Sequence, residues 1–120
     1  LIENLPHQEA LNRKLEADIF IDQIGDKGGW GYGMNSVESL SMGICTLTML
    51  NETYQNFIPD HPFVNVDETN LELKLRLLIN NPDQIKSYGN KGKEWVVQKH
   101  HYVNVGKKLY EYYKKVGIVK

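Results

Sequence analysis

The sequence predicts an α/β fold in which a short parallel sheet is followed by a helical C-terminal tail. In the first half, a strand, a glycine-rich loop, a helix and a second strand follow one another, which is the order of a βαβ unit. In the second half, apolar residues recur every three or four positions, as in amphipathic helices. With 120 residues, 41% hydrophobic and 24% charged, residues 1–120 make one globular domain at most.

The elements of the first half follow from local pattern. Leu11 and Leu15 stand four residues apart behind Pro6, which predicts a short helix over 6–15. Five of the nine residues from 25 to 33 are glycine, which predicts a loop. Around that loop we expect a buried strand at 17–22, a helix at 34–42 that ends at Gly43, and a strand at 44–49. Residues 17–50 therefore form the predicted βαβ unit.

Residues 51–62 look irregular, 63–66 form a short third strand, and 67–120 are predicted to be helical. Thr69 and Glu72 have the spacing of a capping box, and Asn81 with Pro82 marks the start of the next helix. Apolar positions at three- and four-residue spacing follow at Ile85, Tyr88, Gly92 and Trp95. A last helix over 103–116 presents one face made by Val105, Leu109, Tyr112 or Tyr113, and Val116.

Three short strands are few for an open parallel sheet, which commonly has five or six. We therefore expect further strands N-terminal to this chain. A sheet with such an exposed hydrophobic edge is also expected to associate through it.

Charge and composition argue against several classes of function. The formal charge of −1 gives no electrostatic reason to expect nucleic acid or an anionic membrane as a partner, and no apolar run is long enough for a transmembrane segment. Cys45, the single cysteine, lies in an apolar run and is expected to be a buried thiol in a reducing compartment. With no signal peptide, a cytoplasmic location follows, compatible with a peripheral position at the membrane. The four histidines have no metal-site spacing, so no metal is expected.

The candidate site is the glycine loop. In open parallel sheets, ligands bind beyond the carboxyl ends of the strands, and Asp22 and Gln23 stand at such an end. Glycines at 28, 29, 31 and 33 let backbone N–H groups approach a ligand, and the loop leads into a helix N-terminus that favours phosphate. The alternative is a surface connection whose glycines have no binding role.

Glu38 lies one turn into the predicted helix and has two interpretations. Its carboxylate could accept both hydroxyl hydrogens of a ribose diol. Alternatively, Asn35 and Glu38 have the spacing of a capping box, in which Glu38 accepts from the backbone of Asn35. The residues alone do not decide between the two.

The segment from Ala17 to Gln23, the Gly31-Tyr32-Gly33 turn, and the stretch from Asn35 to Ile44 together resemble the donor-binding segment of retaining, GT-B-type glycosyltransferases (group 1). In that family, a strand, a Gly-aromatic-Gly turn and a Glu-Ala-Met-Ala-x-Gly helix precede a second strand. The resemblance covers nearly the whole chain, although its specific part is residues 17–44. The match is closest to a branch with an Asp-Gln pair after the first strand.

The resemblance implies a nucleotide-diphospho-sugar donor bound between two Rossmann-like domains, with no further cofactor. The donor-binding residues would be Gly31, Tyr32, Gly33, Met34, Asn35 and Glu38, and Glu38 would hold the ribose. Many members have a second glutamate where this chain has Trp30; sugar contacts then fall to Asp22, Gln23 or Trp30, with Asp26 as a substitute. The family's basic pair, its acceptor domain and its catalytic groups are absent from this sequence. The chain alone is therefore expected to be an inactive part of a glycosyltransferase that lacks its N-terminal GT-B domain.

Two other classes stay open. One is a dinucleotide-binding half-domain of an oxidoreductase. In favour of it, Glu52 follows the βαβ unit about where dinucleotide-binding domains have an acidic residue. Against it, the G-x-G-x-x-G motif would need glycine at position 36, which is serine. The other is a noncatalytic α/β interaction module. Stabilisation of the full-length parent by UDP or GDP, and not by NAD, would support the glycosyltransferase over the dinucleotide-binding domain.

Overall fold

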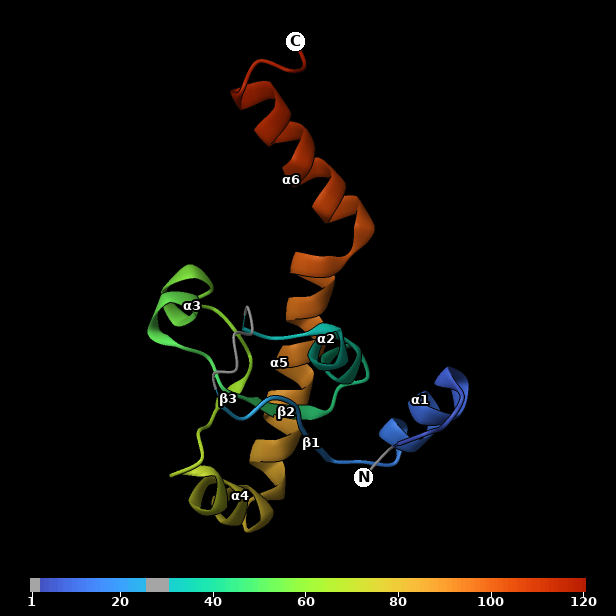
Figure 1. Ribbon diagram of the computed structural model, residues 1–120, viewed down its shortest axis with the longest axis vertical. Helices are drawn as coiled ribbons and strands as arrows, with labels where there is room; N and C mark the ends of the chain where they lie inside the picture. The colour runs from blue at the N-terminus through green and yellow to red at the C-terminus, as the bar shows by residue number, and fades with distance from the viewer. Residues whose placement is uncertain (1–2, 26–30) are drawn as a thin grey trace.

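The computed structural model describes residues 3–25 and 31–120. It contains three parallel strands and six helices within those ranges, and it measures 53 × 33 × 29 Å along its principal axes (Figure 1). The predicted mixed α/β class, with a short parallel sheet and a helical C-terminal part, is confirmed. In chain order the elements are α1 (His7–Leu15), β1 (Ile19–Ile21), α2 (Met34–Ser41), β2 (Cys45–Thr48), α3 (Glu52–Phe57), β3 (Val64–Asn65), α4 (Leu71–Ile79), α5 (Pro82–His100) and α6 (Tyr102–Lys115).

The sheet has the strand order β1-β2-β3, with both pairs parallel. All four residues of β2 are buried, so the central strand is the buried one. The prediction that residues 17–22 form a buried strand is wrong in this respect: β1 lies at the sheet edge, its residues are half-buried or exposed, and Ile21 is 41% exposed. An edge strand is covered by a neighbour on one side only.

The βαβ unit is formed by β1, α2 and β2. Helix α2 ends at Ser41, and Gly43 stops it as predicted, because Gly43 adopts the left-handed conformation with φ of 79°. The Gly43 N–H donates to the Leu40 carbonyl and the Ile44 N–H donates to the Ser39 carbonyl. These two bonds make a Schellman motif, which turns the chain directly from α2 into β2.

Helix α5 packs against α2 and β2 at two glycines. A Cβ atom on Gly92 would stand 2.6 Å from the Leu40 side chain, and one on Gly89 would stand 2.0 Å from the carbonyl oxygen of Gly43. The missing side chains let the helix approach the backbone of the α2–β2 turn. Trp95, one turn further, is buried with Leu40, Leu50 and Phe63 in one of the two core clusters.

Two sequence predictions about local structure are wrong. Residues 51–62 are not irregular throughout, because α3 forms there with Asn51 as its N-cap; the Asn51 side chain accepts from the Tyr54 N–H at 2.9 Å. Thr69 is not the cap of a capping box, because α4 begins after Asn70. Asp67 instead accepts from the backbone and hydroxyl of Thr69, in a turn that precedes the helix. Short polar side chains can bond to several nearby backbone groups, so spacing alone does not select one.

Asn81 and Pro82 begin α5 as predicted, with the Asn81 side chain accepting from the Gln84 N–H. Helix α6 follows after His101 and extends away from the sheet, at the end of the molecule that carries the C-terminus (Figure 1). Its predicted apolar face is present, but no residue of α6 is buried against the described part of the chain.

Candidate nucleotide site

The carboxyl end of β1 meets the N-terminus of α2. Gly33 caps α2 with an extended backbone and no side-chain hydrogen bond. A Cβ atom on Gly33 would lie 3.5 Å from Nε2 of Gln23 and 3.8 Å from Oδ2 of Asp22. The two polar side chains after β1 therefore stand beside the start of the helix, where the first N–H groups precede the regular helical bonds and that of Ser36 donates to the Gly33 carbonyl. The sequence predicted this juxtaposition.

Asp22 is attached to the first turn of α2. The Ser36 hydroxyl, which is buried, donates to Oδ2 of Asp22 at 2.5 Å, a length typical of a hydroxyl-to-carboxylate bond. The backbone on both sides of Asp22 is fixed to β2, because its N–H donates to the Leu47 carbonyl and the Gln23 carbonyl accepts from the Met49 N–H. The carboxylate is thus held at a fixed position next to Gly33.

The glycine turn is fixed by packing as well as by conformation. Gly31 has φ of 80°, and a Cβ atom there would stand 2.5 Å from the ring of Tyr54. Both facts require glycine at this position. Four residues singled out in the sequence, Asp26, Gly28, Gly29 and Trp30, lie outside the described residues.

Tyr32 directs its side chain into the protein. Its ring contacts the rings of Phe63 at 5.0 Å and Trp95 at 5.5 Å between centroids. A hydrogen bond of 3.0 Å joins its hydroxyl oxygen to Nε2 of His100 at the end of α5. Burial, with a smaller contribution from Tyr54, raises the pKa of Tyr32, so the hydroxyl stays protonated. The side chain anchors the turn, which leaves the backbone of this residue as the part that could meet a ligand.

Glu38 is paired with a lysine that the sequence analysis did not single out. Nζ of Lys14, on α1, lies 2.6 Å from Oε2 of Glu38 and donates to Oδ1 of Asn35 at 2.9 Å. The Lys14 side chain is only 7% exposed, whereas that of Glu38 is 26% exposed. Helix α1 therefore contacts α2 through an ion pair, and part of the Glu38 side chain remains exposed.

The capping alternative for Glu38 is wrong. Helix α2 begins at Met34 with Gly33 as its cap, so Asn35 lies inside the first turn rather than before it. The Asn35 side chain bonds to Lys14, and its backbone carbonyl accepts from the hydroxyl of Ser39. The side chain of Met34, the first residue of α2, is 74% exposed, so an apolar side chain stands in solvent at the start of this helix.

Three residues near the site carried little signal in the sequence. In the sequence Lys14 is one of several scattered lysines, and Ser36 stands where a dinucleotide motif has glycine. His100 was set aside with the other histidines, although it bonds Tyr32 and its pKa is lowered by burial. One local pattern could have indicated the Asp22–Ser36 contact. An aspartate directly follows the first strand, and a serine lies in the first turn of the helix that comes next.

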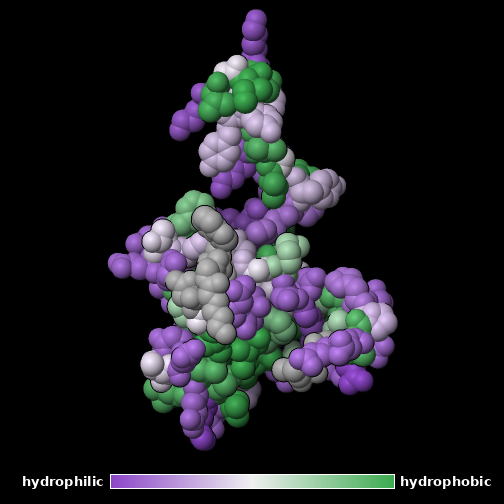
Figure 2. All heavy atoms as spheres, in the orientation of Figure 1, coloured by the Kyte–Doolittle hydropathy of each residue, from purple (hydrophilic) through white to green (hydrophobic). Residues whose placement is uncertain are grey.

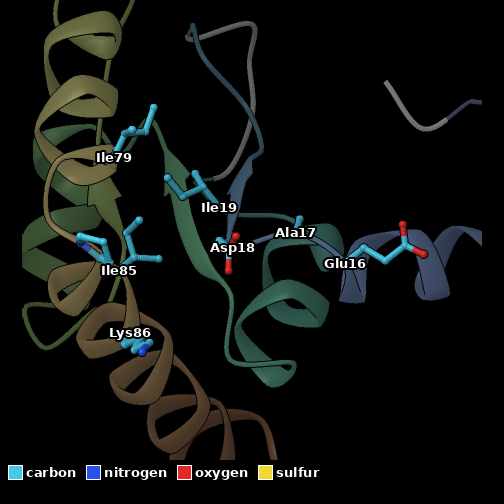
Figure 3. Close-up of a pocket in the computed structure, with 8 residues that line it drawn as sticks. Glu16, Ala17, Asp18, Ile19, Ile79, Ile85 and Lys86 are labelled. Atoms are coloured by element: carbon cyan, nitrogen blue, oxygen red, sulfur yellow. The ribbon is translucent and has the colours of Figure 1, made fainter.

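A separate apolar groove of about 580 Å³ lies at the opposite, amino end of β1. In Figure 3 the segment between α1 and β1 faces the side chains of α4 and α5 across this groove, whose labelled residues are Glu16, Ala17, Asp18, Ile19, Ile79, Ile85 and Lys86. It borders the open edge of the sheet. It does not include the residues that converge at Gly33.

Across 3–25 and 31–120, no three His, Cys, Asp or Glu side chains are grouped so as to hold a metal ion. Within the same ranges no helix is long and apolar enough to cross a bilayer.

Comparison of the chain with models of protein families, with curated proteins and with solved structures finds no match.

Proposed function

We propose that this chain is the donor-binding part of a glycosyltransferase and holds the nucleoside diphosphate of a nucleotide-sugar. The resemblance of residues 17–44 to GT-B donor segments suggests the class. In the whole enzyme, acceptor binding and the catalytic groups would belong to a second domain. We place the reaction in the cytoplasm, where nucleotide-sugars are available.

The observation that supports the proposal most is the meeting of Asp22, Gln23 and the uncapped start of α2 at Gly33. A helix N-terminus attracts anions because its first N–H groups are unpaired and the helix dipole is positive there. Glycine at position 33 keeps the approach to these N–H groups open. The diphosphate would lie at this end of the helix, and the side chains of Asp22 and Gln23 would face the sugar.

Glu38 is suited to the ribose in this arrangement. A carboxylate has about four lone-pair positions, and Lys14 occupies Oε2 alone in the described contacts. The ion pair restricts the rotamers of Glu38, so less side-chain entropy would be lost when a diol binds. Lys14 would also offset part of the charge repulsion between the carboxylate and an incoming diphosphate.

Binding tests the proposal more directly than turnover, because the catalytic groups would belong to a second domain. We expect UDP or GDP to raise the melting temperature of the chain and NAD to leave it unchanged. Stabilisation by NAD alone would support the dinucleotide alternative, which the position of Glu52, just after β2, favours. If none of the three stabilises the chain at millimolar concentration, the donor site is refuted.

Two variants separate the role of Glu38 from the role of the ion pair. Glu38→Gln and Lys14→Met both remove the pair, but only the first removes the carboxylate. We expect Glu38→Gln to weaken nucleotide binding about tenfold, the loss of roughly one charge-assisted hydrogen bond. Lys14→Met should keep most of the affinity. Glu72→Gln, on the exposed surface of α4, is the matched control. Equal losses in the first two variants would mean that the pair matters only for folding.

A further inference from the structure

The side chain of Tyr32 connects the glycine turn, residues 31–33, with the last residue of α5. Its hydroxyl oxygen lies 3.0 Å from Nε2 of His100, which stands 68 positions further along the chain. In Figure 1, α5 passes α2 and ends where α6 begins, and Figure 2 shows hydrophilic residues, in purple, at this junction. The turn at the candidate site is therefore tied to a polar group at the end of a 19-residue helix.

Aromatic rings hold both partners of this hydrogen bond. The ring of His100 lies 5.3 Å from that of Trp95 and meets the ring of Tyr32 edge-on, at 5.7 Å between centroids and 87° between planes. Trp95 is only 4% exposed, and Tyr32 and His100 are half-buried. Because the imidazole is packed among these rings, its bond to the tyrosine hydroxyl has a defined geometry.

The bond acts on the backbone that forms the candidate site. Tyr32 is followed by Gly33, whose carbonyl accepts from the Ser36 N–H in the first turn of α2. On the other side of Tyr32, Gly31 packs against the ring of Tyr54. Glycine has a wide choice of backbone conformations. With glycine on both sides of it, the anchored side chain of Tyr32 limits the conformations that the turn can adopt.

Neutral and protonated histidine form this bond differently. Burial lowers the pKa of His100 and raises the pKa of Tyr32, so at neutral pH the imidazole is uncharged and the phenol keeps its proton. The Nε2 atom of a neutral imidazole can accept the tyrosine hydroxyl hydrogen, whereas both ring nitrogens of an imidazolium are donors. Protonation therefore removes the acceptor of the Tyr32 hydroxyl, and burial disfavours the new charge.

The elements packed around this contact carry other titratable groups. Beside His100 in the chain, Lys99 is paired with Asp60 at 2.8 Å, and the ring of His101 lies on that of Tyr102. The remaining groups are Tyr54, on α3, and His61, whose ring lies 5.9 Å from that of Phe63. Histidines titrate near neutral pH. Residues 61 and 101 therefore need control variants in any pH profile of this contact.

We propose that His100 is a positioning residue of the nucleotide site: when neutral, it holds the glycine turn in its binding conformation through Tyr32, and when protonated, it no longer does. This proposal rests on the proposed function, in which the turn binds a nucleoside diphosphate. The side chain of Tyr32 lies between the turn and His100, so the imidazole acts on the ligand only through the turn. Nucleotide affinity then falls in acid. A direct contact of the imidazolium with diphosphate would have the opposite effect, because a cation strengthens hydrogen bonds to phosphate.

Calorimetric titration of the 120-residue chain with UDP and GDP, at about pH 7.5 and about pH 5.5, tests the pH dependence. His100→Gln is the key variant, because its amide oxygen reaches about as far as Nε2, accepts from the Tyr32 hydroxyl and does not titrate. The diphosphate itself loses charge near about pH 6, so the ratio of affinities at the two pH values is compared between variants. We expect wild type to lose about fivefold more affinity in acid than His100→Gln, the effect of roughly one hydrogen bond. His61→Gln and His101→Asn should keep the wild-type ratio.

Amide hydrogen exchange tests the positioning role without a nucleotide. His100→Leu and Tyr32→Phe each remove the bond, and each should speed exchange of the Ser36 amide about fivefold at neutral pH. The double variant should exchange no faster than either single variant, because both remove the same interaction. His100→Gln should keep the wild-type rate. Gln98→Leu, at an exposed position of α5, is the matched control and should also leave the rate unchanged.

Three results would overturn the proposal: unchanged exchange in both His100→Leu and Tyr32→Phe, equal affinity ratios in wild type and His100→Gln, or a wild-type affinity that rises in acid relative to His100→Gln. Circular dichroism checks that each variant keeps its helices. If UDP or GDP binds but exchange does not respond, the nucleotide site stands and the role of His100 is refuted. If exchange responds but neither nucleotide binds, the nucleotide site is refuted and only the anchoring of the turn by His100 stands.

Discussion

The close approach of α5 to the α2–β2 turn predicts that Gly89→Ala destabilises the protein. The new Cβ atom would lie 2.0 Å from the carbonyl oxygen of Gly43 and 2.9 Å from its carbonyl carbon, whereas ordinary contacts are 3.4 Å or longer. Both atoms belong to the backbone of a turn with φ of 79°, so neither can rotate away as a side chain would. Helix α5 must therefore move by about 1 Å or more, which disturbs the packing of Trp95 on Leu40.

Adding one methyl group to a well-packed core costs typically about 1–3 kcal/mol, and a clash with backbone belongs at the upper end. Replacing glycine by alanine within a helix returns about 1 kcal/mol through helix propensity. We therefore expect Gly89→Ala to lower the free energy of unfolding by about 2 kcal/mol in urea titrations followed by circular dichroism. Gly106→Ala on α6, where no heavy atom lies within 4 Å of the new Cβ, should raise it by up to about 1 kcal/mol. A neutral or stabilising Gly89→Ala would refute this account of the packing.

Two further expectations concern ionisable groups. Burial lowers the pKa of His61 and His100, so the folded state binds fewer protons than the unfolded state. The free energy of unfolding should therefore fall as the pH drops below about 6.5. Urea unfolding midpoints measured at about pH 7.5, 6 and 5 would show this fall. His100→Gln should flatten this dependence, and a stability that stayed level or rose in acid would contradict the assignment. Burial also raises the pKa of the fully buried Cys45 to about 11. Its thiol should therefore react with a disulfide reagent only as fast as the protein opens. Rapid labelling of the native chain would argue against this burial.

The features that sequence predicted correctly are those determined by neighbouring residues. Gly43 ends α2 because a left-handed residue is needed there, and Asn81 with Pro82 starts α5 because cap and first turn are adjacent in the chain. The strand, loop, helix and strand order of the βαβ unit also follows from local runs of residue type. The placement of Asp22 and Gln23 near the glycine turn follows from that order, since the carboxyl end of a strand must precede its connection.

The contacts that define the candidate site were not predictable in this way. Lys14 reaches Glu38 across 24 positions of sequence, and Tyr32 reaches His100 across 68. Nothing in the pattern near Lys14 separates it from solvated lysines, because its burial depends on where α1 lies against α2. The same holds for β1, whose apolar composition predicts a buried strand although its position at the edge leaves Ile21 partly in solvent.

Local pattern thus decides which segments of this chain are strand, turn and helix, since those choices depend on backbone preferences over a few residues. Only the assembled structure decides which side chains meet, because that depends on how distant segments pack. The apolar face of α6 combines both levels. Its spacing is evident in the sequence, but its exposure is a property of the folded chain, in which α6 projects beyond the core that could have covered it.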